Sequence, residues 1–429
     1  MKIKVYQTRF ITLLAIILIV TACMVNAQLT NTVTIQNTGQ ISSTTVWAKS
    51  GTAEDIQAAV DAVAAAGGGT VYVPEGDFPF DINGSKIYLG VPVGVIVKGG
   101  ISIIGSGKDK TILRQTRSDI NEANFFYCDG INGKPIRISG LTLIGNVTDE
   151  AFNNRGIRML RATDFRIDHC KFIDFSGSAI IASNYLAPYG ANRGVVDHCE
   201  FDNPYKDDPN VIGAGGNGRK IWGYGVHLTG TSYNWEENID NLLGKYDELS
   251  NIVYVEDCTF RRCRHAVTSN GGVFYIVRYC KFYEPRPEHY QMVDVHGTSG
   301  DAPAVGGRGL EAYNNIFYGC EYKWQAEPPY DWHSMAFGIR GGGGVIFNNT
   351  IIDCETGILL AADPGQQEKC RIHDMWIWNN VMAQQNATGS MVYIKNTGGY
   401  VENVDYFLYG KTDYTPYPYP HPLTLEKAP

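Results

Sequence analysis

Short runs in which apolar and polar residues alternate recur along most of the chain. TVYVP (70–74), GLTLIGN (140–146) and GVHLT (225–229) are examples. A period of two predicts a β-strand with one buried face, and the Gly, Asn and Asp residues between the runs favour tight turns. The pattern therefore predicts many short strands and few helices.

One segment departs from this pattern, at GTAEDIQAAVDAVAAAGGGTVYVPEG, residues 51–76. Thr52 is placed to cap a helix, with Asp55 three positions later. Ile56, Val60 and Val63 recur at helical spacing and form its apolar face. Glycines at 67–69 end the helix, after which the chain enters a strand.

A five-residue motif recurs between residues 168 and 351. Its copies are DHCKF (168–172), DHCEF (197–201), EDCTF (256–260), RYCKF (278–282), YNNIF (313–317) and FNNTI (347–351). The copies are about 22 to 35 residues apart, with one interval near 59, which indicates a repeated unit with loop insertions. Each copy has Cys or Asn two residues before an apolar residue, and we expect these side chains to stack in one internal column of successive coils.

The cysteines fit this repeat better than they fit a disulfide framework. Five residues after the motif position lies a second predicted column, which contains Cys263, Cys320 and Cys354. Small, nearly apolar thiols suit such internal columns, whereas parallel side chains in register are poorly aimed for disulfide bonds. Disulfides remain the alternative, because the N-terminal residues described below predict export.

The helix and the repeats together resemble the pectate-lyase superfamily, in which a helix closes the open end of a stack of coils. GLTLIGN (140–146) and GVIFNNTIIDC (344–354) extend the resemblance over about residues 50–400. It implies an all-β fold, a right-handed parallel β-helix with an N-terminal capping α-helix. It leaves the activity open, because lyases, hydrolases, epimerases and phage adhesins share this architecture.

The N-terminus has the layout of an export signal, with basic residues, an apolar run and small residues. We expect a signal peptide at 1–27. VTAC (20–23) offers an alternative end as a lipoprotein signal, with Cys23 as the lipid anchor. The protein is accordingly expected to be secreted or to be a cell-envelope lipoprotein. No later run is apolar for long enough to predict a transmembrane segment.

The rest of the chain divides into three parts. We expect a lead-in at 28–50, the β-helix domain at 51–410 and a proline- and tyrosine-rich tail at 411–429 that packs over the last coils. Proline cannot continue a sheet ladder, which is why the tail is set apart.

Composition and charge limit the partners. The 429 residues include 48 Gly and 26 Tyr, and the formal net charge is −8. This charge argues against a nucleic-acid partner, which normally requires a basic face. It leaves room for a locally positive groove, and we expect an extracellular polysaccharide as the partner.

One strand of each coil carries an unusual outer face. Aligning these strands by an inward apolar residue gives Ile157, Ile180, Val226, Val267, Val293, Ile339 and Ile358. The next, outward position then reads Arg158, Ile181, His227, Thr268, Asp294, Arg340 and Leu359. Two residues further on, the outward column reads Leu160, Ser183, Thr229, Asn270, His296, Gly342 and Ala361.

The middle coils therefore concentrate polar residues on one surface. We expect His296, Asp294, Arg340 and His227 to be catalytic. The substrate-binding candidates are Arg158, Thr268, Asn270, Arg264, His265, Trp222, Tyr290, Trp324 and Trp332. The alternative is an ordinary solvated sheet face, on which an exposed ion pair of Asp294 with Arg340 contributes less than about 1 kcal/mol.

These residue types suit uronate β-elimination, the leading activity. A guanidinium neutralises the sugar carboxylate, and an imidazole removes the C5 proton. Lyases of the superfamily often bind calcium; no clustered-aspartate site is visible, so Ca²⁺ stays an open cofactor and no metal ligands are assigned.

Two other functions stay open. Glycoside hydrolysis needs two carboxylates, and the columns supply only Asp294, so a partner would have to come from Glu311, Glu327 or Asp331. A non-catalytic glycan-binding or adhesin role is the main alternative, since aromatic loops on stacked coils can bind sugars without cleaving them.

Overall fold

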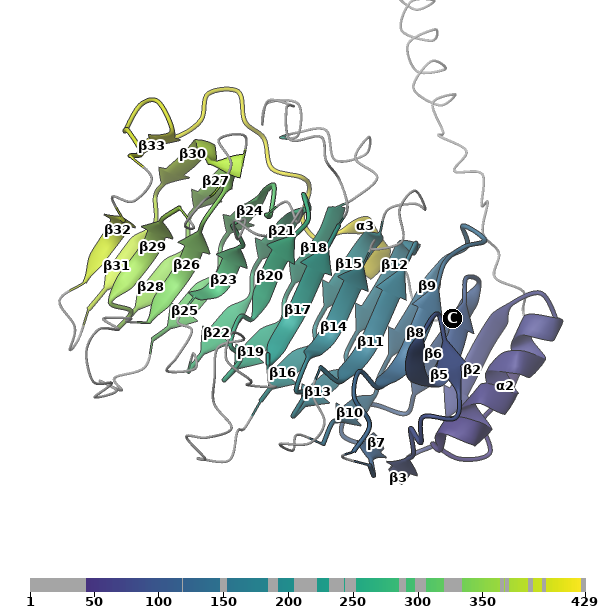
Figure 1. Cartoon of the computed structure of the whole chain (residues 1–429). Coiled ribbons are helices and arrows are strands. Elements are labelled where there is room, and N and C mark those ends of the chain that lie inside the picture. The colour runs from purple at the N-terminus through teal and green to yellow at the C-terminus, as the bar shows by residue number, and fades with distance from the viewer. Residues whose placement is uncertain are drawn as a thin grey trace, which may run out of the picture. The chain divides into compact units, whose positions relative to one another are not determined.

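In the computed structural model, all described residues fall within Ile41–Pro429. The described residues are 44–117, 119–146, 153–183, 192–203, 222–230, 243, 252–284, 291–297, 306–319, 334–362, 366, 370–384, 389–395 and 399–425. The predicted signal segment, with Cys23, lies outside them, as do Cys320 and most of the long insertions. Within the described part, three long sheets run side by side along the molecule (Figure 1).

The first is a twelve-stranded sheet. Its strands are β1 (Thr45–Trp47), β2 (Gly69–Val73), β6 (Ile101–Gly105), β9 (Ile136–Ser139), β12 (Thr163–Asp168), β15 (Arg193–Asp197), β18 (Ile252–Glu256), β21 (Phe274–Arg278), β24 (Gly309–Tyr313), β27 (Gly342–Phe347), β30 (Ile372–Trp378) and β33 (Tyr406–Phe407).

The second is a ten-stranded sheet made of very short strands. They are β3 (Gly76–Phe80), β7 (Thr111–Gln115), β10 (Thr142–Ile144), β13 (Lys171–Ile173), β16 (Glu200–Asp202), β19 (Thr259–Arg261), β22 (Lys281–Tyr283), β25 (Ile316–Tyr318), β28 (Thr350–Ile352) and β31 (Val381–Ala383).

The third is an eleven-stranded sheet, which carries the candidate site. Its strands are β4 (Ile87–Tyr88), β5 (Val91–Lys98), β8 (Asn124–Asp129), β11 (Arg155–Leu160), β14 (Ser178–Ser183), β17 (Tyr224–Thr229), β20 (Val267–Asn270), β23 (Gln291–Val295), β26 (Met335–Ile339), β29 (Thr356–Leu360) and β32 (Ser390–Ile394).

The chain visits the three sheets in turn, so that β9, β10 and β11 form one coil and β12, β13 and β14 form the next. Successive coils pair in parallel, and Ile157 lies opposite Ile180, which lies opposite Val226. Among the described strand pairs only β4 with β5 is antiparallel. The architecture is a right-handed parallel β-helix, as the sequence predicted.

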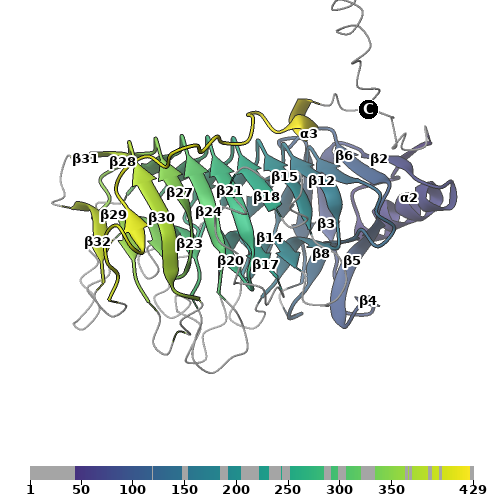
Figure 2. The same ribbon diagram turned by 90° about the horizontal axis from the view of Figure 1, so that it is seen from above.

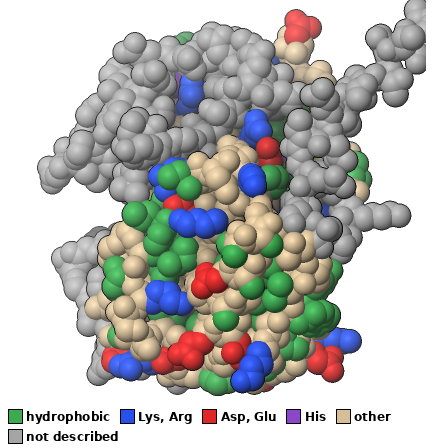
Figure 3. Space-filling model, turned by 90° about the vertical axis from the view of Figure 1, so that its right-hand side faces the viewer, with side chains coloured by type: hydrophobic (Ala, Val, Ile, Leu, Met, Phe, Trp, Pro, Cys, Tyr) green, Lys and Arg blue, Asp and Glu red, His purple; other side chains and the backbone are tan. Residues whose placement is uncertain are grey.

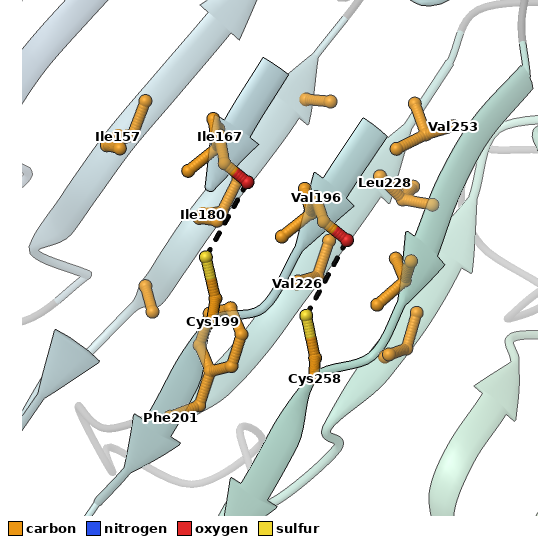
Figure 4. Close-up of a cluster of buried hydrophobic side chains, with 14 of the residues drawn as sticks. Ile157, Ile167, Ile180, Val196, Cys199, Phe201, Val226, Leu228, Val253 and Cys258 are labelled. Carbon is orange, nitrogen blue, oxygen red and sulfur yellow. Dashed lines mark hydrogen bonds between the residues drawn. The ribbon is translucent and has the colours of Figure 1, made fainter. Parts of the chain in front are cut away.

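The core runs the length of the stack as columns of like side chains. Phe172, Phe201 and Phe260 stack with ring centroids 5.0 and 4.5 Å apart. Figure 4 shows Cys199 and Cys258 aimed at the carbonyls of Ile167 and Val196, at 3.6 and 3.5 Å. The predicted column of motif residues is therefore internal, and its thiols satisfy a carbonyl of the preceding coil.

The same column changes from cysteine to asparagine further along. Asn315 Nδ2 donates to Asn349 Oδ1 at 2.9 Å, and Asn349 Nδ2 donates to Asn380 Oδ1 at 2.9 Å. The eight cysteines of the described part are buried thiols outside any disulfide bond, which agrees with the internal-column prediction rather than with a disulfide framework. The residue just before each motif Cys or Asn bends the chain through positive φ, for example 51° at His169 and 52° at His198.

Helix α2 (Ala53–Ala65) closes the N-terminal end, as predicted. The Thr52 side chain accepts a hydrogen bond from the Asp55 amide, and Ile56, Val60 and Val63 are buried. Figure 2 shows the helix across the end of the stack, and Figure 3, which views that end, shows charged side chains of both signs scattered among apolar ones. The helix thus protects the first coil with its apolar face and turns its polar face outward.

The C-terminal tail lies along the outer face of the twelve-stranded sheet (Figures 1 and 2). The Tyr417 carbonyl accepts from Arg278 at 2.8 Å, and the His421 amide donates to Glu256 at 3.0 Å. The short helix α3 (Pro422–Leu425) contacts β12 and β15. The sequence predicted that the tail packs over the last coils. The tail instead extends past them, back to strands β12 and β15 near the middle of the chain. In the described part of the chain, no helix has the length and apolar character needed to cross a membrane.

Candidate functional site

Five of the predicted residues meet on the outer surface of the eleven-stranded sheet. We name them the polar cluster; they are His227, Thr268, Asp294, His296 and Arg340. In β17, β20 and β23, His227 lies opposite Thr268, and Thr268 lies opposite Asp294. Because Val293 and Val295 are buried in the core, strand alternation sends Asp294 and His296 to the opposite, outer surface.

Asp294 is the centre of the cluster and is fully buried. Its Oδ2 accepts from Thr268 Oγ1 at 3.0 Å and from Arg340 Nη2 at 2.9 Å, and its Oδ1 accepts from Arg340 Nε at 3.2 Å. Burial opposes ionisation, but the charge of Arg340 prevails and holds the pKa of Asp294 well below its usual range. Asp294 is therefore an ionised carboxylate that orients its neighbours and has no exposed surface of its own for a sugar.

His296 lies at the outer edge of the cluster, with 35% of its side chain exposed. Its Nδ1 faces two groups: Arg340 Nη2, within hydrogen-bond contact, and Asp294 Oδ2, at 3.4 Å. A guanidinium can only donate, so Nδ1 accepts from Arg340 and the imidazole proton is placed on Nε2. The Arg340 side chain is 17% exposed. Of Asp294, His296 and Arg340, the last two therefore face solvent.

The sequence alignment of Arg340 needs a correction. It placed Ile339 opposite Val293 and Arg340 beside Asp294, whereas Phe337 is opposite Val293 and Gly338 is opposite Asp294. Arg340 therefore belongs one outward position later, and its amide donates to the Val295 carbonyl at 3.0 Å. The ion pair still forms because the long guanidinium side chain reaches back to the carboxylate.

The Gln291 side chain packs against the backbone at Gly338 and leaves no room for a side chain there. A Cβ at Gly338 would stand 2.3 Å from Cγ of Gln291. Gln291 thus covers this part of the surface and is a site neighbour that sequence reasoning missed. The available signal was its position at the start of the strand that carries Asp294.

His227 joins the cluster from the N-terminal side. Asn270 Nδ2 lies 3.3 Å from its Nε2, and Ser178 Oγ lies 3.5 Å from its Nδ1. Burial, followed by the positive charge of Arg155, lowers the pKa of His227 to about 3. His227 is therefore neutral at pH 7, and its low pKa makes it a weak proton acceptor.

A second group of predicted residues lies at the strand starts. His265 is buried, its Nδ1 is 2.8 Å from the Gln291 carbonyl, and burial lowers its pKa to about 3. Its ring stacks on Tyr224, whose hydroxyl accepts from Arg264 at 3.0 Å. The Arg264 guanidinium lies over the Trp222 ring, 4.8 Å from its centroid. These side chains support the cluster from one edge.

Arg158, another binding candidate, is not gathered with the cluster. Arg158 shares the column of Asp294 but lies four strands away, about 19 Å at 4.8 Å per strand, and sits over the Tyr127 ring. Tyr290, Trp324 and Trp332 lie outside the described residues.

Among the residues that the structure describes, the charge on this surface is locally positive, although the whole chain is acidic. Strands β11, β14, β17, β20, β23 and β26 contain one acidic residue, Asp294. Arg155 and Arg158 stand on β11, and Arg264 and Arg340 flank β20 and β26. With His227 and His265 neutral, cations exceed carboxylates here, which favours an anionic ligand.

One of the carboxylates predicted to pair with Asp294 in a glycoside hydrolase lies elsewhere in the structure. Glu311 lies on β24 in the twelve-stranded sheet, is fully buried and accepts from Tyr414 at 2.9 Å. It cannot pair with Asp294 across the cluster, so that prediction is wrong. Glu327 and Asp331 lie outside the described residues. Within the described part, no group of three His, Cys, Asp or Glu side chains is arranged to hold a metal ion.

Solved structures share this architecture. The tailspike of E. coli bacteriophage HK620, in complex with a pentasaccharide, matches with a TM-score of 0.52 and 13% identity, over 80% of this chain and 55% of the tailspike chain. The chain is a parallel β-helix. The match confirms the predicted fold and shows the fold alone.

Two further matches have lower TM-scores. An alginate lyase from Paenibacillus sp. str. FPU-7 matches at 13% identity and TM-score 0.48, over 82% of this β-helix chain and 98% of its own. The A-module of a mannuronan C-5 epimerase from Azotobacter vinelandii matches at 15% identity and TM-score 0.31, over 83% and 95%. No protein-family model and no curated protein matches the sequence. At 13% identity the tailspike match shows the fold alone, and the activity has to be argued from the site.

Proposed function

We propose that this β-helix protein binds an acidic, uronate-containing polysaccharide at the polar cluster and cleaves it by β-elimination. The observation that carries the proposal is the contact of Arg340 with both Asp294 and His296 at a solvent-facing edge. It places a permanent cation beside an imidazole, the two groups that uronate elimination requires.

In the proposed reaction the sugar carboxylate binds Arg340 and draws its Nη2 away from His296. With Nδ1 released, the imidazole exchanges its Nε2 proton with solvent for a proton on Nδ1. This Nδ1 proton is donated to Asp294 Oδ2, which already lies 3.4 Å away, and His296 Nε2 becomes the acceptor. The C5–H bond breaks with transfer of the proton to Nε2, the C4=C5 double bond forms, and the C4–O4 bond breaks. The imidazolium returns the proton to the leaving O4, so a single histidine balances both transfers.

The burial of Asp294 assigns it a positioning role in this scheme. The carboxylate is fully enclosed, so it acts through Arg340 and His296. The low pKa of His227 removes it as the base and leaves it as part of the wall beside Asn270.

The test is incubation of the purified mature chain with a panel of uronate polymers. Elimination produces an unsaturated sugar that absorbs at about 235 nm, whereas hydrolysis gives reducing ends without that absorbance. Absorbance with at least one polymer is expected. New reducing ends without it, or no product from any polymer, would overturn the proposed reaction.

Binding without cleavage is the second candidate, and one observation favours it. Both oxygens of Asp294 are already hydrogen-bonded within the protein, as in a structural ion pair. On this alternative, oligouronates bind the polar cluster with no product formed. Affinity electrophoresis in polymer-containing gels separates this outcome from inactivity.

We also propose that the protein acts outside the cell, on the basis of its export-type N-terminus. Mass spectrometry of the N-terminus after expression in a bacterial host tests this. Processing before Cys23 with an attached lipid supports a lipoprotein, and processing before Gln28 supports secretion. An unprocessed chain contradicts both.

A further inference from the structure

Two copies of the DHC motif place a histidine pair that the proposed function does not use. His169 follows β12 and His198 follows β15, at the same bend in consecutive coils. The bend lies at the end of the twelve-stranded sheet, whereas the polar cluster is on the eleven-stranded sheet.

The two imidazoles are parallel neighbours. Their planes differ by 5° and their ring centroids are 4.9 Å apart. The side chains are 57% and 48% exposed. An incoming solute can therefore reach both rings from the same side.

Each ring is held by the aspartate that precedes it. His169 Nδ1 lies 2.9 Å from Asp168 Oδ2, and His198 Nδ1 lies 2.9 Å from Asp197 Oδ2. An ionised carboxylate can only accept, so both rings carry their proton on Nδ1 in the neutral form. The Nε2 lone pairs are left as the acceptors, and no described residue donates a hydrogen bond to either Nε2.

Arginine side chains hold both of these carboxylates in place. Arg137 Nε donates to Asp168 Oδ1 at 2.8 Å, and Arg166 Nη2 donates to Asp197 Oδ2 at 2.9 Å. Both carboxylates are buried. Burial opposes ionisation of Asp168, but hydrogen bonds from Arg137 and His169 hold its pKa well below its usual range. Each histidine thus has a charged, immobile orienting partner.

We propose that His169 and His198 bind a borderline transition-metal ion, such as Zn²⁺, Ni²⁺ or Cu²⁺, through their two Nε2 atoms. Imidazole suits these ions, and a carboxylate on the opposite ring nitrogen raises the basicity of the ligand. The chain supplies two ligands and water supplies the others, which is consistent with the lack of a three-residue group in the described part. Tetrahedral ligation at about 2.0–2.1 Å needs nitrogens about 3.3 Å apart, so the rings lean together on binding. Their exposure permits this movement.

The adjacent bends limit the site to these two residues. Gly140 occupies the bend before His169, and Asp257 occupies the bend after His198. The Asp257 carboxylate is engaged by the Tyr419 hydroxyl at 2.8 Å. An imidazole binds a metal ion only when the coordinating nitrogen is deprotonated, so protons compete with the metal in mild acid.

The experiment is calorimetric titration of the tag-free mature chain with Zn²⁺ and with Ni²⁺ at pH 7.5 and at pH 5.5. We expect one ion per chain at this site, weaker at pH 5.5. His169→Ala and His198→Ala should each weaken binding by about tenfold or more, because a single imidazole remains. Both side chains are exposed, so the variants are expected to fold.

The matched control is His373→Ala. His373 also contacts a neighbouring aspartate, Asp374 at 3.0 Å, and its side chain is 35% exposed, but no described histidine stacks on it. Its removal should leave the affinity unchanged. Absence of binding by the wild-type chain, or equal affinity of His169→Ala and wild type, would overturn the site. Neither measurement depends on the proposed elimination activity.

Discussion

Arg340 Nη2 donates to Asp294 Oδ2 at 2.9 Å, although 46 positions separate the two residues in the chain. The same nitrogen contacts His296 Nδ1. One guanidinium thus joins a buried carboxylate to an exposed imidazole, and the protonation of His296 depends on what else Arg340 binds.

Replacing His296 tests the proton transfer directly. His296→Gln keeps a similar shape without a titratable ring, and we expect the elimination rate to fall by about 10²-fold or more. Initial rates at about 235 nm, with circular dichroism as a check on folding, measure this. His373→Gln, equally exposed on β30, is the control and should retain the rate. A folded His296→Gln enzyme with the wild-type rate would remove this histidine from the reaction.

Arg340→Ala should weaken binding of oligouronates by about tenfold or more, because a charge-assisted hydrogen bond contributes about 1.5–3 kcal/mol. Neutral oligosaccharides should bind as they do to wild type. Calorimetry on both ligand classes gives the comparison. Arg193→Ala removes the same charge from an exposed pair with Asp164 on another sheet, and should have little effect. Equal losses for charged and neutral ligands would contradict the neutralising role.

Asp294→Asn should destabilise the protein by about 3 kcal/mol, because it leaves the largely buried Arg340 cation without its counter-ion. The urea unfolding midpoint measures this. Asp77→Asn breaks a half-exposed pair with Arg114 and should cost less than about 1 kcal/mol. If both variants behaved alike, Asp294 would be an ordinary surface partner.

Acid should destabilise the fold through His265. Its folded-state pKa of about 3 lies below the unfolded value of 6.5, so below pH 6.5 the unfolded chain binds a proton that the folded chain does not. Stability contributed by the neutral ring is complete above pH 6.5 and declines toward pH 3, by up to about 1.4 kcal/mol per pH unit. His265→Asn should reduce the fall in the urea unfolding midpoint between pH 7 and pH 4.5, and the contribution of His227 should remain. An unchanged slope would show that the acid sensitivity originates elsewhere.

The column of motif residues predicts that removing an asparagine side chain destabilises the protein more than removing a cysteine side chain. Asn349 accepts from the Asn315 amide at 3.0 Å and donates to the Ala312 carbonyl at 3.0 Å, so Asn349→Ala leaves buried partners unsatisfied and should cost about 3 kcal/mol. Cys258→Ala removes a weak thiol hydrogen bond to the Val196 carbonyl and should destabilise the protein by about 1 kcal/mol. Denaturant titration of the two variants provides the test. Comparable losses would mean that packing volume, rather than hydrogen bonding, sets the stability of the column.

The sequence by itself determined the scaffold. Alternation, the spaced motifs and the capped helix at Thr52 are local signals, and each coil repeats the same local choices, so columns such as Cys199 and Cys258 follow from counting. Alternation also put Asp294 and His296 on one outer face, because side-chain direction in a strand has a period of two.

Only the tertiary structure decided the rest. The alignment misplaced Arg340 by one outward position because Phe337 and Ile339 are both apolar and inward, so two registers satisfy the same pattern. Burial of Asp294 and His265, the cover formed by Gln291, and the assignment of Glu311 to another sheet depend on contacts between distant segments. Such contacts set solvent access and charge environment, and no single strand contains that information.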